Sequence, residues 1–185
     1  MKFVSLGSGS SGNCYLLQSG ETSILLDAGI SMRSLKKHLK DFGISLDKDI
    51  SAVFVTHDHA DHIKSVGNIA CDCGKKIYAT QHVHEGISCN RCLKVKVPTE
   101  CRAFLEKGCM LEVGPFRITP FDVPHDSRDC VGYVVPSAIG YIENNAPRMI
   151  KTPWYDEEIP FNMAAEIGTK KVIAEHATIG LVVTT

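Results

Sequence analysis

Short apolar runs separated by glycine and serine open the chain, and such runs are typical of β-strands. Four of them precede the most histidine-rich segment; they are Lys2–Leu6, Cys14–Gln18, Ser23–Leu26 and Ser51–Val55. Between the third and fourth runs, Met32, Leu35 and Leu39 recur at the spacing of one helix face. Ser31 and Gly43 supply the start and stop signals of that helix.

The pattern continues with less regular elements. The expected elements are a helix over Ile63–Ala70, a strand over Ile77–Ala79, a hairpin formed by Met110–Val113 and Phe116–Val123, a helix over Phe161–His176 and a strand over Ile179–Thr184. Prolines become frequent from about residue 129, and strand signals are few from there until the last helix. A polar cluster follows the strand at 51–55, at the end of a strand where α/β proteins place their sites.

Composition narrows the class of protein. The 185 residues are 44% hydrophobic and 22% charged, which is enough for one sizeable core. No run approaches the roughly 18 apolar residues of a membrane span, and residues 1–7 do not resemble a signal peptide, so we expect a cytoplasmic protein without a membrane span. Twenty basic and 21 acidic residues create no long-range field for nucleic acid, so such a partner must be held locally.

The strongest chemical signal is His57-x-His59-x-Asp61-His62, three imidazoles and a carboxylate within six residues. These groups are the preferred ligands of Zn²⁺, with Mn²⁺ or Fe as alternatives. Burying them without a partner would be costly, and no simple structural role needs this set. The segment therefore predicts a metal site rather than a solvated polar turn.

Four segments together resemble the metallo-β-lactamase superfamily of binuclear hydrolases, in its branch of small cytoplasmic phosphodiesterases and exonucleases. They are Leu6–Cys14, Leu25–Gly29, His57–His62 and Val123–Asp126. The resemblance covers about residues 1–135 and implies an αββα sandwich with metals at one edge. Carried over by position, it implies a first metal on His57, His59 and His125 and a second on Asp61 and His62. Asp27 matches the aspartate that orients the ligand loop.

The resemblance also implies a reaction. Two metal ions would activate a shared water as hydroxide and hold the oxygens of a phosphodiester, including one at a nucleic-acid end. Asp61 would be a ligand and a catalytic proton acceptor. A β-lactam is a less suitable substrate, because nothing in the sequence indicates a secreted resistance enzyme.

Two ligands of the family pattern are missing from their expected context downstream. No aspartate in an Asp-Thr-Gly-like turn follows Tyr133–Val135, and Asp156 lies among prolines. His176 could serve as the final histidine, but a histidine at a helix end is more often a favourable C-terminal cation. With five of about seven ligands, we expect one bound metal and low activity.

A second resemblance covers about residues 129–185 and is nearly continuous. The stretches Asp129–Tyr133, Pro147–Trp154, Glu157–Phe161, Ala164–Thr169 and Glu175–Gly180 are similar to stage IV sporulation protein A, a coat-forming P-loop ATPase of spore formers. Asp129-x-x-Gly132 would match the magnesium-side turn of that family. The 185 residues contain no Gly-x-x-x-x-Gly-Lys-[Ser/Thr] phosphate loop, so we expect no ATP hydrolysis.

The two resemblances predict a chain in two parts. Residues 1–130 form the metallo-β-lactamase-like part, an incomplete sandwich, and 131–185 a foreign α/β tail, with the join within 127–135. A natural fusion, a misassembled reading frame and a truncation all remain open. The alternative function is a spore-coat assembly fragment or an inactive hybrid, with spore-coat partners if the tail is functional.

Eight cysteines in a chain expected to be cytoplasmic are thiols or metal ligands rather than disulfides. Cys71-x-Cys73 and Cys89-x-x-Cys92, with His82 and His84 between them, resemble a small structural zinc site, although only Cys89-x-x-Cys92 has the usual ligand spacing and Cys71-x-Cys73 is tighter. This cluster is a third hypothesis, a cysteine-organised metal module. The alternative is reduced thiols that pack as small apolar groups or lie exposed.

Overall fold

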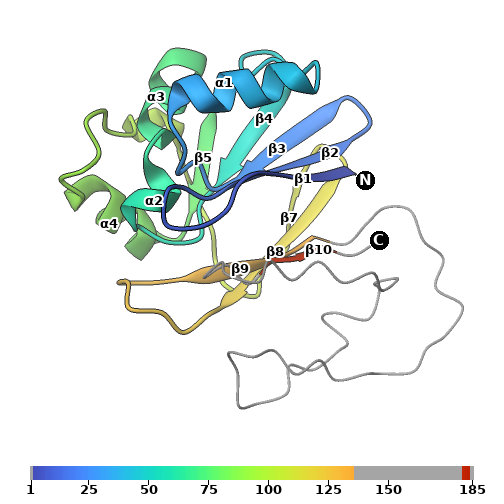
Figure 1. Cartoon of the computed structure of the whole chain (residues 1–185). Coiled ribbons are helices and arrows are strands. Elements are labelled where there is room, and N and C mark those ends of the chain that lie inside the picture. The colour runs from blue at the N-terminus through green and yellow to red at the C-terminus, as the bar shows by residue number, and fades with distance from the viewer. Residues whose placement is uncertain (1, 136–180, 184–185) are drawn as a thin grey trace, which may run out of the picture.

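Two stacked β-sheets and a layer of helices make up the computed structural model, which describes residues 2–135 and 181–183 (Figure 1). The larger sheet has the spatial order β1 (Lys2–Gly7), β2 (Cys14–Ser19), β3 (Thr22–Leu26), β4 (Ile50–Phe54), β5 (Lys76–Ala79) and β6 (Arg102–Phe104). The smaller sheet has the order β10 (Leu181–Val183), β9 (Val131–Val135), β8 (Phe116–Asp122) and β7 (Leu111–Val113). The helices are α1 (Met32–Asp41), α2 (Ala60–Ile63), α3 (Val66–Cys73) and α4 (Gln81–Cys89), with a 3-10 turn at Thr99–Cys101.

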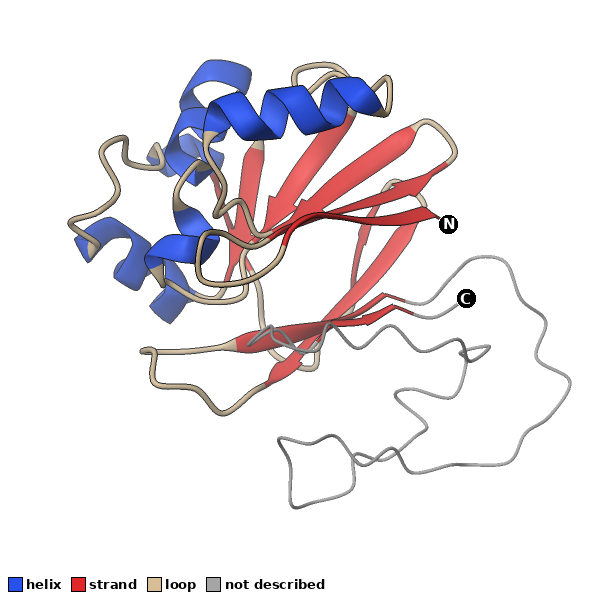
Figure 2. Ribbon diagram, viewed as in Figure 1, coloured by secondary structure: helices blue, strands red, loops and turns tan. Residues whose placement is uncertain are grey.

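Strand direction brings the polar loops together. β1, β2 and β3 pair antiparallel, whereas β3, β4, β5 and β6 pair parallel. Parallel neighbours need crossover connections, and these contain α1 to α4 on the outer face of the larger sheet (Figure 2). The carboxyl ends of β3, β4 and β5 therefore lie at one edge, where their following loops meet.

Alternating side chains give the larger sheet two apolar faces. Leu25 and Val53 belong to the core cluster on the helix side, which also contains Leu35 and Leu39 of α1. On the opposite face, neighbouring strand positions such as Phe54 belong to a second cluster with residues of β8 and β9. A strand buried on both faces explains the unbroken apolar run that ends at residue 55.

The first third of the chain confirms the predicted elements. α1 begins after Ser31, whose hydroxyl accepts a hydrogen bond from Ser34 N at 3.1 Å. The segment Ile63–Ala70, expected to be helical, is helical except at residues 64 and 65, where a turn separates α2 from α3. Ser65 lies at the break because its N–H donates to Ala28 O and its hydroxyl donates to Ile30 O.

Three elements were not expected. α4 occupies the cysteine- and histidine-rich stretch, where the Thr80 hydroxyl accepts a hydrogen bond from Val83 N as an N-cap. β6 follows shortly after, and β9 lies where strand signals were considered few, although Val-Gly-Tyr-Val-Val is an apolar run. The helix expected over 161–176 lies outside the described residues, and β10 falls within the strand expected over 179–184.

The helix, sheet and sheet layers confirm the predicted α/β sandwich class within the described residues. β9 lies beyond the expected boundary at 130/131, yet Val131, Tyr133 and Val135 are buried in the core between the two sheets. Residues 131–135 therefore belong to the core of the sandwich, and the two-part division stays a prediction. Within the described part of the chain, no helix is long and apolar enough to cross a membrane.

Candidate metal centre

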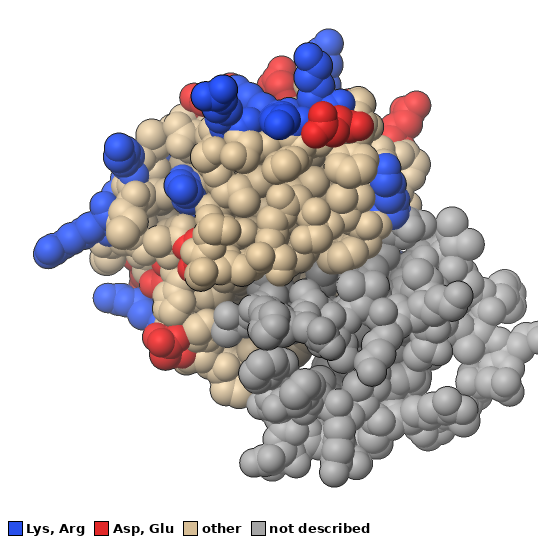
Figure 3. All heavy atoms as spheres, viewed as in Figure 1, with Lys and Arg blue, Asp and Glu red and all other residues tan. Residues whose placement is uncertain are grey.

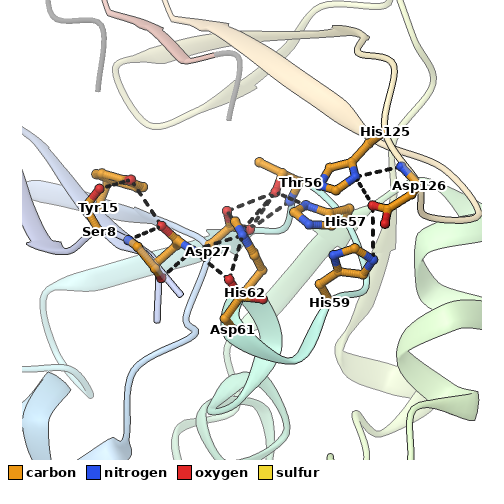
Figure 4. A network of polar contacts seen from close by, with 12 residues as sticks. Ser8, Tyr15, Asp27, Thr56, His57, His59, Asp61, His62, His125 and Asp126 are labelled. Carbon is orange, nitrogen blue, oxygen red and sulfur yellow. Dashed lines mark hydrogen bonds and ion pairs between the residues drawn. The ribbon is translucent and has the colours of Figure 1, made fainter. Parts of the chain in front are cut away.

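Three histidines from two loops meet at the edge of the larger sheet. His57 and His59 follow β4, and His125 lies in the loop between β8 and β9. One ring nitrogen from each lies within 4.8 Å of the others, and the ring centroids are 4.5 to 4.8 Å apart (Figure 4). The fold therefore brings together the three residues that the sequence assigned to the first metal.

The chemistry of this cluster fits a cation. His57 is fully buried, and burial together with the neighbouring imidazoles lowers its pKa to about 2, so the ring is neutral at pH 7. Its Nδ1 is 2.9 Å from the Thr56 hydroxyl, whereas its Nε2 has no hydrogen-bond partner among the described residues. The Nε2 atom of His125 is also buried without a partner there. Two buried, unpaired nitrogens are suited to metal coordination.

Asp126 lies at the open side of the cluster. Its backbone N–H donates to His125 Nδ1 at 2.7 Å, and its carboxylate is 3.8 Å from His59 Nε2. The side chain is 82% exposed, so solvent reaches this side of the three histidines. The sequence identified Asp126 within a motif but assigned no role to it.

A buried carboxylate, Asp27, connects the loop after β3 to the loop after β4. Asp27 is fully buried with φ of 56°, a left-handed conformation that aspartate tolerates better than most residues. It accepts hydrogen bonds from Thr56 N at 2.8 Å and from the Thr56 hydroxyl at 2.9 Å, and it lies 2.8 Å from His62 Nδ1. Burial would lower the pKa of His62, but the charge and hydrogen bond of Asp27 outweigh it and raise that pKa. This geometry fits the orienting role implied for Asp27.

Asp61 and His62, implied as ligands of a second metal, lie next to the first cluster but form only a pair. The His57 and His62 ring centroids are 4.0 Å apart, and Asp61 Oδ2 is 3.6 Å from His62 Nε2. Among the described residues, only His57, His59 and His125 form a group of three ligands. The assignment of Asp61 and His62 therefore stays a prediction.

Asn13 is a site residue that the sequence reasoning missed. Its side-chain amide donates to Asp61 Oδ2 at 3.1 Å and lies 3.0 Å from His62 Nε2. The same side chain exchanges hydrogen bonds with Gly9, which holds the glycine- and serine-rich loop against the site. Asn13 ends the motif Gly-x-Gly-x-x-Gly-Asn at residues 7–13, but nothing in that motif indicated a contact with residues 61 and 62.

A cavity of about 330 Å³ opens beside Asp61. Ser10, Ser11, Asp61 and Lys64 are among the residues that line it. An ammonium group and two hydroxyls next to the metal loop form a polar lining that suits an anionic group.

The other proposed metal sites are not assembled. Cys71, Cys89 and Cys92 are exposed, and no group of three ligands within the described residues includes a cysteine, so the structural zinc hypothesis is not supported. Asp129 is ion-paired with Lys107 and accepts a hydrogen bond from Thr80, so it is already engaged, unlike a magnesium ligand. Asp156 and His176 lie outside the described residues.

Known proteins are similar to two overlapping parts of the chain. Residues 22–142 match the Beta-lactamase superfamily domain, and residues 123–185 match the ATPase domain of stage IV sporulation protein A. Exodeoxyribonuclease WalJ of Streptococcus pneumoniae is 28% identical over 159 residues, covering 81% of this chain and 58% of that protein. Stage IV sporulation protein A of Bacillus subtilis is 70% identical over 57 residues, 31% of this chain and 12% of that protein. The chain thus spans about half the length of the exonuclease it matches and a small part of the sporulation protein.

Solved structures show the same fold. The Rm3 metallo-β-lactamase aligns with a TM-score of 0.63 at 16% identity, covering 75% of this chain and 55% of that one. A class B3 di-zinc metallo-β-lactamase, LRA-12, aligns with a TM-score of 0.58 at 18% identity over 68% of this chain and 52% of that one. The layered sheets and the match over 22–142 lead to one conclusion: the chain belongs to the β-lactamase superfamily.

Proposed function

We propose that this protein is a metal-dependent hydrolase that cleaves phosphodiesters, acting on nucleic-acid ends. The observation that carries the proposal is the cluster of His57, His59 and His125, in which two buried ring nitrogens have no hydrogen-bond partner within residues 2–135. Zn²⁺ is the metal we propose, with Mn²⁺ or Fe as alternatives, since all three accept imidazole ligands.

The residues around the cluster have separable roles in this proposal. A bound divalent ion would supply Lewis acidity and activation of water. Asp61, with its side chain one-third exposed at the cavity, would accept the proton released by the attacking water. Lys64 would bind the substrate phosphate in the same cavity. Asp27 and Asn13 would hold the ligand loop in place through His62.

Two relatives support the choice of substrate. WalJ and YycJ are both described as exodeoxyribonucleases, and YycJ of Bacillus anthracis is 29% identical over 133 residues, 72% of this chain and 49% of that protein. Because the chain spans only about half of each, their activity is a proposal for this protein. We expect one metal per chain and a rate limited by the incomplete second ligand set.

Hydrolysis assays test the proposal directly. Purified full-length protein with Zn²⁺ or Mn²⁺ should hydrolyse bis-p-nitrophenyl phosphate, and His59→Ala should abolish this activity. His38→Ala, in the last turn of α1 away from the cluster, is the matched control and should retain it. Absence of metal-dependent hydrolysis in the wild-type protein, or equal loss in both variants, would refute the proposed activity.

We further propose that the chain has two parts of different ancestry, 1–130 and 131–185. Two domain families match overlapping ranges, 22–142 and 123–185, and the chain is 70% identical over 57 residues to stage IV sporulation protein A, the family that matches 123–185. If the second part is functional, spore-coat proteins would be its partners. Sequencing of the flanking DNA tests this. A continuous β-lactamase-type reading frame across the join, with the missing aspartate turn downstream, would contradict it.

A further inference from the structure

A groove lies on the far side of α4 from the buried core of the molecule. It is a cavity of about 680 Å³ between α4, the edge strand β6 and the loop between β8 and β9. Phe104, Arg102, Arg128 and His84 are among the residues that line it. None of them has a role in the metal centre described above.

The aromatic ring in this groove is unusually accessible. Phe104, on edge strand β6, is 64% exposed, whereas phenylalanine is normally buried. The ring of the buried His84 meets it edge to face at a centroid distance of 5.1 Å, which fixes one side of the ring and leaves the other to solvent. An exposed ring face is a stacking surface for an unpaired base.

His84 adds no charge to the groove. Its Nε2 is 3.0 Å from Ala103 O, next to Phe104, and burial lowers the pKa of the ring, which is therefore neutral at pH 7. These contacts fix the His84 ring beside Phe104, so the groove would recognise a base by stacking.

Charge in the groove favours a phosphate backbone. Arg102 is held in place by donating from Nε and Nη2 to Val97 O, at 3.3 and 3.2 Å. The exposed side chain of Arg128 makes no hydrogen bond or ion pair with the other residues that the structure describes. Glu85, the one carboxylate among the described residues that line the groove, accepts a hydrogen bond from Gln81 at 3.1 Å. Figure 3 shows further Lys and Arg side chains on the side of the molecule where α4 lies.

The groove is tied to the metal loops on both sides. Asn90, at the end of α4, donates to Asp58 O at 2.8 Å, and the Thr80 hydroxyl before α4 donates to Asp129 at 2.6 Å. Arg128 follows His125 by three positions in the same loop. Three residues of extended chain span at most about 10 Å, so the backbone of Arg128 lies within that distance of the backbone of His125. That length corresponds to about three stacked nucleotides.

We propose that this groove binds the unpaired strand of a DNA substrate, with a base stacked on Phe104 and a phosphate at Arg128. The inference rests on the proposed function, because it assumes a nucleic-acid substrate, and it adds the strand state and the residues that recognise it. A strand whose end lies at the three histidines would place a base within about three nucleotides of that end in the groove. A fully paired end offers no free base to Phe104.

Binding measured without catalysis tests the inference. Fluorescence anisotropy with a labelled single-stranded dT oligonucleotide in EDTA should give at least roughly fivefold weaker binding for Phe104→Ala, the loss of one stacked base. Arg128→Ala should also weaken binding and reduce its salt dependence. Phe42→Ala and Arg33→Ala, at exposed positions of the α1 region, are the matched controls and should bind as the wild type does. A blunt duplex of the same length should bind more weakly and equally to wild type and Phe104→Ala.

The two proposals fail in different assays. Wild-type affinity of both Phe104→Ala and Arg128→Ala, equal weakening in the α1 controls, or no measurable binding of the wild type would overturn the groove inference. Hydrolysis of bis-p-nitrophenyl phosphate should be unchanged in Phe104→Ala, since this substrate does not reach the groove. Absence of metal-dependent hydrolysis of this substrate in the wild type would instead refute the proposed hydrolase activity. Thermal melting of Phe104→Ala would check that the variant is folded, and Arg128→Ala provides an independent substitution at an exposed position.

Discussion

A single buried carboxylate, Asp27, links the carboxyl end of β3 to the loop that follows β4. We expect Asp27→Asn to lower the free energy of unfolding by about 3 kcal/mol, because the variant leaves the His62 ring without its buried anionic partner. Urea unfolding monitored by circular dichroism measures the change. Asp41→Asn, at an exposed position of α1, should change stability by less than about 0.5 kcal/mol. Equal stability of the two variants would show that Asp27 is not a structural link.

The opposite pKa shifts of His57 and His62 predict that the metal-free protein is most stable near neutral pH. The folded-state pKa of His57 is lowered to about 2, so below about pH 6.5 only the unfolded state takes up that proton and stability falls toward acid, by at most about 1.4 kcal/mol per pH unit. The pKa of His62 is raised, so its contribution is complete below its unfolded pKa and is lost as the pH rises through the folded value.

Urea midpoints between pH 5 and 8, measured in EDTA, test this dependence. His57→Gln should remove the loss of stability toward acid pH and keep the loss toward alkaline pH that His62 causes. A wild-type curve that stays flat down to pH 5 would contradict the buried, neutral state of His57.

At the scale of elements, α4 determines the shape of the loop that carries the histidines. Gly86 faces Asp58 so closely that an added Cβ would overlap the Asp58 carboxylate. In an open helix, Gly→Ala stabilises by roughly 1 kcal/mol. Here we expect Gly86→Ala to destabilise by about 1–3 kcal/mol, because the carboxylate and its loop must move. The variant should also bind Zn²⁺ more weakly.

Thermal melts and metal titrations of the same preparation measure both effects. Cys89→Ala, exposed at the end of the same helix, is the control and should behave as the wild type does. A Gly86→Ala protein that melts at a higher temperature than the wild type would show that α4 and the metal loop are not in rigid contact.

For the whole molecule, metal and folding should be linked. The three histidines come from segments almost 70 residues apart in sequence, so only the folded state presents them together. Zn²⁺ at one hundred times its Kd should add about 2.7 kcal/mol, or roughly 5–10 °C in Tm. His59→Ala should lose this gain, whereas His38→Ala should keep it. We expect saturation at about one equivalent per chain. A Zn²⁺-independent Tm would argue against a metal centre at the histidine cluster.

Local sequence signals were reliable where periodicity and capping agreed. The first three strands, the Ser31-capped helix and the hairpin around residues 114 and 115 were all predicted, because each is encoded by contiguous residues. α4 was missed because its histidines and cysteines were interpreted as ligands, although Thr80 gave a capping signal. β9 was missed because nearby prolines masked a short apolar run. The break at Ser65 had no local cause, since its partners lie in the loop after β3.

The sequence by itself determined the ligand types and the loop after β4 as their location, since these depend on residue identity and short spacing. The class of the fold and the grouping of His125 with His57 and His59 were implied by the family resemblance. Only the tertiary structure showed which ligands meet. It brought His125 to His57 and His59 and paired Asp61 and His62 with Asn13, whereas no group of three ligands among the described residues includes a cysteine. The reason is physical: metal coordination requires donor atoms within a few ångströms, and that proximity comes from strand order and loop packing, which short spacings do not encode.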